Sequence, residues 1–508
     1  MRFFRFSSSD KYFEEDQIKS DLKKHSIRGV GATFFSQSFT YCIQLVSTFI
    51  IARILTPDDF GVVAMVISIF QFFMMYRTLG LLDATIQTDN INHKLISTLF
   101  WINLTFGLIL SLLLIGIAPI IAWFYGEPKL KAIAISLSVV LLFGGAATQH
   151  MALIKRNMEF YKAACVEIIA AILSITFALT LAINDYGYWA LVARHIVLAG
   201  SIFVGYWLIC PWRPGLPSFG NEALSMIKFG MNMLGSYSLT YFAENLDKIL
   251  IGWRYGSHSL GNYDRAYQLF LAPSQRLTFP MTHVAVSTLG RLKKEPEKYC
   301  RYYIKSFSFL AFIGFPISAV LTVSGVDIIL LLLGPQWSEA ANIFSIFGLT
   351  IGIHMLYSTN GWLHISMGRS DRWLKWGIIS ALVTCCSFII GLSWGALGVA
   401  IAYTTSMYLM IIPALWYAGG PINLKISSLL SSSWKFYISA FCAGFITWYL
   451  THMNPHTSEV FSDLNILIRL TISTSMCTIS YLFLVITLYQ STKPISDFII
   501  LLKSFIQK

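Results

Sequence analysis

The chain has 508 residues, of which 56% are hydrophobic and only 12% are Asp, Glu, Lys or Arg. A soluble domain carries about twice that share of charge, so the composition excludes a soluble globular protein, and it also excludes a disordered chain. The net charge of +12 leaves two classes, a nucleic-acid-binding protein and a membrane protein with basic cytoplasmic loops. The eight cysteines show no paired or metal-type spacing, so we expect neither a disulfide framework nor a metal site.

Apolar stretches recur along the whole chain. A helix needs about 20 apolar residues to cross a bilayer, and about fourteen stretches approach or exceed that length. Their approximate bounds are 30–53, 61–82, 97–125, 131–150, 164–183, 188–210, 226–252, 265–289, 303–325, 342–367, 376–394, 396–418, 433–451 and 464–489. The sequence therefore predicts an all-α polytopic membrane protein with about fourteen transmembrane helices.

The basic residues are distributed unevenly between the predicted loops. With a cytoplasmic N-terminus, 27 of the 37 Lys and Arg lie in cytoplasmic segments and six lie outside. This asymmetry follows the positive-inside rule and predicts that both termini are cytoplasmic. It also accounts for the basic charge without nucleic acid. The other four, Arg77, Arg194, Arg276 and Arg469, lie within predicted spans.

The two halves of the chain resemble each other at an offset of about 200 residues. Phe60-Gly61 matches Leu260-Gly261, and the polar residues of the first span match those of the seventh. These matches predict two parallel six-helix lobes followed by two added helices, an arrangement found in transporters. The expected segments are a cytoplasmic amphipathic segment (1–29), the first lobe (30–219), the second lobe (220–424), helices thirteen and fourteen (425–490) and a cytoplasmic interfacial tail (491–508).

Short motifs at the ends of the predicted helices resemble a known family. Residues 53–61 read RILTPDDFG, which is similar to the AR-x-L-x-P-x-D/E-F-G signature of polysaccharide exporters. Asn245-x-Asp247-Lys248, the motif at 260–267 and Phe279-Pro280 fit the same pattern. From about residue 28 to 490, the chain resembles the Wzx-like polysaccharide-transporter branch of the MOP exporters, the lipid-linked oligosaccharide flippases. The exporters of colanic-acid-type exopolysaccharide are the most similar.

This resemblance implies a MATE-like, V-shaped pair of lobes that works by alternating access. The implied substrate is an undecaprenyl-diphosphate-linked oligosaccharide, which moves from the cytoplasmic to the outer leaflet of a bacterial inner membrane. Coupling to H⁺ or Na⁺ is expected, as are membrane lipids, a polysaccharide polymerase and chain-length proteins as partners. The resemblance implies a transporter and not an enzyme, and no cofactor is expected.

Polar residues at helical spacing mark a candidate cleft. Thr33, Gln37, Thr40, Gln44 and Ser47 lie on one face of the first helix, and Ser236, Thr240, Glu244 and Asp247 lie on one face of the seventh. We expect Gln37, Gln44, Ser236 and Thr240 to contact substrate. Glu244 and Asp247 are candidates for ion coupling, because a buried carboxylate readily carries a proton. The alternative is that the hydroxyl groups only allow close helix packing.

The intramembrane arginines are the candidate diphosphate ligands, because a guanidinium stays charged and binds phosphate through two hydrogen bonds. Arg276 is the first candidate, followed by Arg194 and Arg77. The alternative for each is a structural pair with a carboxylate. The histidines of the spans are isolated, which argues against a metal site.

Two other function classes remain open. A small-molecule exporter of the same fold would be distinguished by the absence of neighbouring glycosyltransferase genes. A membrane-embedded polysaccharide polymerase or ligase would need a large outer loop with clustered His, Arg and acidic residues. The longest predicted outer loop, from 451 to about 464, is too short for that.

Overall fold

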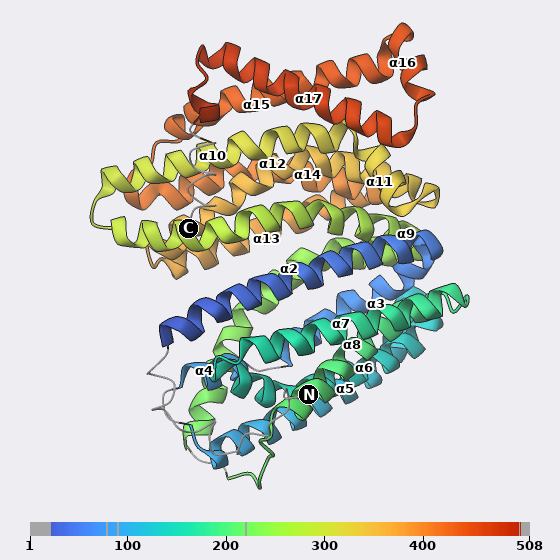
Figure 1. Cartoon of the computed structure of the whole chain (residues 1–508), viewed down its shortest axis with the longest axis vertical. Coiled ribbons are helices and arrows are strands. Elements are labelled where there is room, and N and C mark those ends of the chain that lie inside the picture. Colours follow the sequence, from blue (N-terminus) through green and yellow to red (C-terminus); the bar gives the residue numbers. More distant parts are fainter. Residues whose placement is uncertain (1–21, 78–79, 89–90, 219–220, 497, 499–508) are drawn as a thin grey trace. The chain divides into compact units, whose positions relative to one another are not determined.

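The computed structural model describes residues 22–77, 80–88, 91–218, 221–496 and 498, without the side chains of 22–37, 221–240, 242–244 and 455–456. The described residues are almost entirely helical and include no β-strand (Figure 1). This confirms the all-α class. Most of the predicted segment 1–29 and the end of the tail 491–508 lie outside this description.

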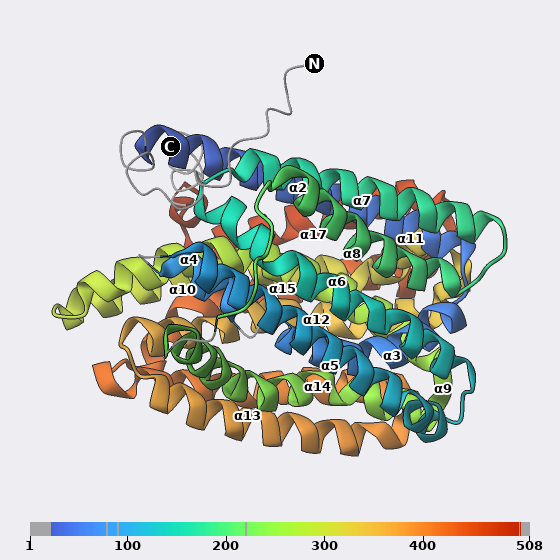
Figure 2. The same cartoon turned by 90° about the horizontal axis from the view of Figure 1, so that it is seen from below.

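Contacts divide the chain into two units, Met1–Gly261 and Asn262–Lys508. The first unit contains α2 (Leu22–Ile54), α3 (Pro57–Tyr76), α4 (Leu81–Gln87), α5 (His93–Tyr125), α6 (Lys129–Arg156), α7 (Phe160–Ile183) and α8 (Trp189–Ile209). Helix α9 (Asn221–Leu292) crosses the boundary and is interrupted at Gly256, whose φ of 79° and ψ of −172° are not helical. Within the first unit α6 is central, because it packs against α3, α4, α5 and α8 (Figure 2).

The second unit contains α10 (Pro296–Val323), α11 (Gly325–Leu333), α12 (Ser338–Ser366), α13 (Ser370–Gly391), α14 (Gly395–Gly419), α15 (Ile426–Trp448), α16 (Pro455–Ser462) and α17 (Ile466–Tyr489). Helix α12 packs against α10, α11 and α14, and α13 packs against α14. The last long helices, α15 and α17, pack on each other and on α10 (Figure 1).

The two units repeat one packing scheme. In the first, α5 packs on α6, α7 on α8 and α6 on α8; in the second, α10 packs on α12, α13 on α14 and α12 on α14. This supports the predicted internal repeat with an added helix pair. The contact boundary falls at Gly261, whereas the sequence placed the lobe boundary at 219/220. One reason is that α9 contacts α3, since the Tyr241 hydroxyl donates to the Ser68 carbonyl at 2.7 Å.

Every predicted apolar stretch falls on a helix. By length and composition, nine candidate spans are found in the described part of the chain. Their exposed side chains are large and apolar, as in Leu112, Ile169, Leu382 and Phe483, which is the composition of a lipid-facing surface. The number fourteen itself stays a prediction.

Some helix boundaries differ from the predicted ones. Residues 22–28, expected on the cytoplasmic surface, continue directly into the apolar part of α2. The predicted span 61–82 is two helices, because α3 ends at Tyr76 and α4 begins after Gly80, whose φ is +66°. A positive φ is cheap only for glycine, which explains why the break ends there.

Candidate functional site

The polar face of α2 meets an arginine from α8. Arg194 donates to the Thr48 hydroxyl at 3.3 Å, and the Thr48 hydroxyl donates to the carbonyl of Gln44 at 2.7 Å. Ser47 donates to the same carbonyl at 2.9 Å. One turn away, the buried hydroxyl of Thr40 has no partner among the described residues. The structure therefore places Arg194, a predicted site residue, against Thr48, whose hydroxyl is held by the backbone carbonyl of Gln44.

Arg77 lies where α3 ends. Its Nη1 is 3.9 Å from the Met74 sulfur, and its Nε is buried without a partner. Within the part of the chain that is described, no carboxylate forms an ion pair with this guanidinium. The side chain crosses α6 at Gly144, where a β-carbon would overlap the Arg77 Cδ. Arg77 is thus a partly buried cation supported by apolar and glycine surface.

Two buried amides lie near the Arg77 crossing point. Asn103 of α5 is fully buried, and neither its amide nitrogen nor its oxygen has a partner among the described residues. Its backbone packs against Gly145, the residue after Gly144, where the Arg77 side chain crosses α6. Gln149 of α6 accepts from the Thr85 hydroxyl at 3.1 Å, but its nitrogen has no described partner. Such groups are costly in an apolar interior. Both amides lie within predicted apolar stretches, 97–125 and 131–150, a signal from which they could have been found.

The predicted carboxylate Asp247 is completely buried in α9. Its Oδ1 accepts the backbone N–H of Lys248 at 2.8 Å. Asp247 is thus a buried carboxylate, and its role in ion coupling stays a prediction. The side chains of four other predicted site residues lie outside the described part: Gln37, Ser236, Thr240 and Glu244.

Arg276 belongs to the second unit and is exposed on α9. The opposite face of this segment is buried through Ser274 and Thr278. Ser274 forms a hydrogen bond with Nδ1 of His354 on α12 at 2.8 Å, which fixes the rotation of the helix. A charged side chain at membrane depth faces a water-filled cavity or a polar partner and not lipid. The exposed face that carries Arg276 is therefore a candidate cavity wall.

Arg469, the fourth arginine within a predicted span, has a structural partner. Its Nη2 lies 2.6 Å from Oδ1 of Asp327, which joins α17 to α11. A hydrogen bond between the hydroxyls of Ser324 and Ser473 at 2.8 Å supports the same contact. Among the described residues no group of three or more His, Cys, Asp or Glu could hold a metal ion.

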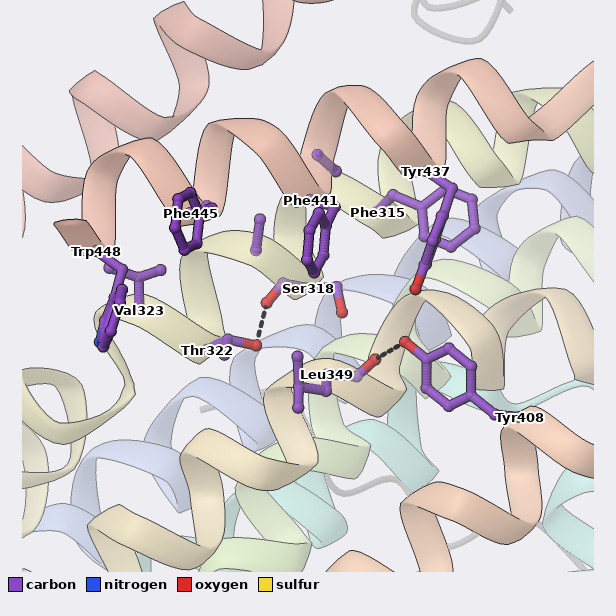
Figure 3. Close-up of a pocket in the computed structure, with 13 residues that line it drawn as sticks. Phe315, Ser318, Thr322, Val323, Leu349, Tyr408, Tyr437, Phe441, Phe445 and Trp448 are labelled. Carbon is purple, nitrogen blue, oxygen red and sulfur yellow. Dashed lines mark hydrogen bonds between the residues drawn. The ribbon is translucent and has the colours of Figure 1, made fainter.

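An apolar pocket of about 510 Å³ lies in the second unit among α10, α12, α14 and α15 (Figure 3). Three of its hydroxyls bond to backbone carbonyls: Ser318 donates to Gly348, Thr322 to Ser318 at 2.8 Å and Tyr408 to Leu349 at 2.9 Å. The remaining surface is mostly carbon. Aromatic side chains of α15 form one wall: Tyr437, Phe441, Phe445 and Trp448. The pocket was not predicted from the sequence, although these four aromatic residues recur there at helical spacing.

The chain matches a family model and several characterised proteins. Residues 50–342 match the model described as polysaccharide biosynthesis protein. The teichuronic acid biosynthesis protein TuaB of Bacillus subtilis is 25% identical over 93% of this chain and 97% of its own length. The succinoglycan biosynthesis transport protein ExoT of Rhizobium meliloti is 26% identical, over 73% of this chain and 75% of ExoT. The Escherichia coli lipopolysaccharide biosynthesis protein WzxC is 21% identical over 82% of this chain and 84% of WzxC.

Solved structures show the same fold. The lipid II flippase MurJ in an inward closed conformation aligns with a TM-score of 0.70 at 16% identity, covering 91% of this chain and 99% of MurJ. An inward-facing MATE transporter of the MOP superfamily aligns with a TM-score of 0.53 at 14% identity, covering 78% and 96%. At these identities the likeness shows the fold alone. Since the family model matches more than half of its residues, the chain belongs to the family of polysaccharide biosynthesis proteins.

Proposed function

We propose that the chain is a flippase that moves an undecaprenyl-diphosphate-linked oligosaccharide from the cytoplasmic to the outer leaflet by alternating access. Its relatives carry the names of polysaccharide biosynthesis and transport proteins, and MurJ, a lipid II flippase, shares its fold. The substrate charge and sugar hydroxyls need a polar path, because each unpaired polar group costs several kcal/mol in hydrocarbon. The polyprenyl chain can stay in lipid.

The observation that carries this proposal is Arg77. A partly buried guanidinium without a carboxylate partner among the described residues is costly in a membrane span, so a ligand that is present only during transport is the expected counter-ion. A diphosphate matches the donor geometry of arginine. Arg194 beside Gln44 and the exposed Arg276 are further diphosphate contacts in this proposal, together with Gln37, Ser236 and Thr240 along the two polar faces.

The coupling and location are also part of the proposal. Asp247, which is fully buried, and Glu244 are the groups proposed to exchange H⁺ or bind Na⁺ during transport. The proposed location is a bacterial inner membrane with both termini in the cytoplasm. A polymerase and chain-length proteins would receive the flipped unit.

The test is flipping of a fluorescent undecaprenyl-diphosphate disaccharide in proteoliposomes. Wild-type protein should flip it. Removing a charged hydrogen-bond partner costs about 1.5–3 kcal/mol, so Arg77→Ala and Arg276→Ala should lower the rate about tenfold to a hundredfold. Arg77→Lys and Arg276→Lys should recover part of it, because a point charge replaces the two-pronged donor. Arg301→Ala, an exposed arginine on α10, is the control. Wild-type-like flipping by well-folded Arg77→Ala and Arg276→Ala would reject both sites.

A small-molecule exporter is the second candidate, favoured by the fold shared with a multidrug MATE transporter at a TM-score of 0.53. Drug-stimulated ion flux without flipping of the lipid probe would support it. Flipping without drug-dependent flux would support the first proposal.

A further inference from the structure

Two segments that are 200 residues apart in the sequence meet in the structure. A β-carbon on Gly61 would overlap the carbonyl oxygen of Ser257, and one on Gly261 would overlap the carbonyl oxygen of Pro57. The Gly261 β-carbon would also lie 3.1 Å from the Gly61 nitrogen. The contact is therefore reciprocal, as between two copies related by a two-fold axis. We name it the glycine crossing.

Both helices begin at the glycine crossing. Helix α3 starts with Pro57 after the N-cap Thr56, whose hydroxyl and the Asp59 carboxylate form a capping box. The second part of α9 starts at Ser257, directly after the interruption at Gly256. Small residues four apart let helix backbones touch, and larger ones keep them separated. The signature residues at 53–61 are thus explained by a helix start followed by a backbone contact.

One polar contact supplements this packing. The Ser257 hydroxyl donates to Oδ1 of Asp58 at 2.7 Å. Arg77 follows Pro57 by 20 residues and Arg276 follows Ser257 by 19. In the sequence, each candidate diphosphate ligand therefore follows the start of its helical segment by about five helical turns.

We propose that the glycine crossing is the outer gate of the transporter, which is closed in this structure and must separate for the substrate to leave. The inference rests on the proposed function and on the predicted orientation, which places the starts of both helices at the outer surface. A backbone contact without intervening side chains is either made or lost, which suits a gate with two states. A methyl group on either glycine should weaken the closed state.

A disulfide across the glycine crossing tests the gate. In the double variant Asp58→Cys/Ser257→Cys, two cysteines replace side chains whose oxygen atoms lie 2.7 Å apart. Oxidation should abolish flipping of the fluorescent undecaprenyl-diphosphate disaccharide, and reduction should restore it. The control is Ser324→Cys/Ser473→Cys, which replaces two hydroxyls 2.8 Å apart within the second unit and should tolerate oxidation. Unchanged flipping by fully oxidised Asp58→Cys/Ser257→Cys would overturn the proposal.

A distance measurement tests the gate independently of the identity of the transported substrate. Spin labels at Arg53→Cys and Arg254→Cys, both exposed beside the glycine crossing, should report a short and a long distance in nanodiscs. Gly61→Ala and Gly261→Ala should enrich the long one. Gly116→Ala, where a β-carbon has no neighbour within 4 Å, should change neither. A single short distance in wild type and in folded Gly61→Ala would overturn the gate. Two distances without flipping of the probe would support the gate and reject the proposed substrate.

Discussion

The side chain of Arg77 reaches the interior of the first unit because α6 has no side chain at Gly144. A β-carbon there would overlap Cδ of Arg77 and lie 2.5 Å from its Nε. The next residue, Gly145, lets the backbone of Asn103 approach from α5. Two neighbouring glycines therefore serve two different contacts, one with a cation and one with a helix backbone. The position of the proposed diphosphate ligand is set by a residue that carries no charge.

Gly144→Ala should displace the guanidinium of Arg77 without changing its charge. We expect flipping of the lipid probe to fall about tenfold, since a misplaced charged hydrogen bond costs about 1.5 kcal/mol. Gly116→Ala in α5 is the matched control, because its β-carbon meets no atom within 4 Å and alanine favours the helix. Equal flipping rates for the two variants, at equal protein levels, would show that the missing side chain at Gly144 does not position Arg77.

Among the elements, the connector at 210–218 is held firmly although it is not helical. Gly215 donates to the Ser97 hydroxyl and Ser218 to the Thr98 hydroxyl, both at 2.9 Å. Trp101 donates to the Gly215 carbonyl at 2.8 Å, and Trp212 is completely buried. The connector is therefore part of the first unit as far as it is described.

Amide hydrogen exchange should report the two backbone hydrogen bonds of the connector separately. Ser97→Ala should speed exchange of the Gly215 amide about fivefold and leave Ser218 unchanged, since one hydrogen bond is worth about 1 kcal/mol. Thr98→Ala should do the reverse, so each variant controls the other. Rapid exchange at both amides in wild type would contradict a fixed connector.

If the flippase proposed above holds the polyprenyl chain of its substrate in the apolar pocket of the second unit, filling this pocket should weaken binding of the lipid probe. Gly444 lies in its wall, where a β-carbon would be 3.3 Å from Cβ of Ala319. Gly444→Leu should fill the pocket and raise the lipid-probe concentration needed for half-maximal flipping. Gly377→Leu is the control, because its β-carbon meets no atom within 4 Å. The same half-maximal concentration in both variants would remove the pocket from the transport path.

At the scale of the whole molecule, the helices and their repeat could be predicted because long apolar runs leave few alternatives to a helix in a membrane. Gly61 and Gly261 were matched by sequence alone, and the structure places them against each other. The break after Arg77 was not predicted, since 61–82 reads as one apolar run. The lobe boundary was placed in the loop before α9, whereas the contact boundary lies inside that helix.

The candidate site was predictable only in part. Arg194 could be singled out because charged residues at membrane depth are rare, and it contacts Thr48 on the polar face of α2. That α8 packs this way could not be read from periodicity. The pairing of Arg469 with Asp327 was also missed, because the partner lies 142 residues away in the sequence. Local patterns identify polar faces, but the partner of a charge depends on tertiary packing.

The orientation of the whole molecule follows from its charge distribution and can be tested directly. The opposite orientation would place 27 basic residues outside the cell, against the positive-inside rule, so we expect a single topology. Single cysteines at exposed Lys294 and Asp371 should react with a membrane-impermeant maleimide only after permeabilisation, whereas one at exposed Glu459 should react in intact cells. Mass spectrometry of the labelled peptides separates these positions from the native exposed Cys42 and Cys386. Labelling of Lys294→Cys in intact cells would reverse the orientation and move the glycine crossing to the cytoplasmic end.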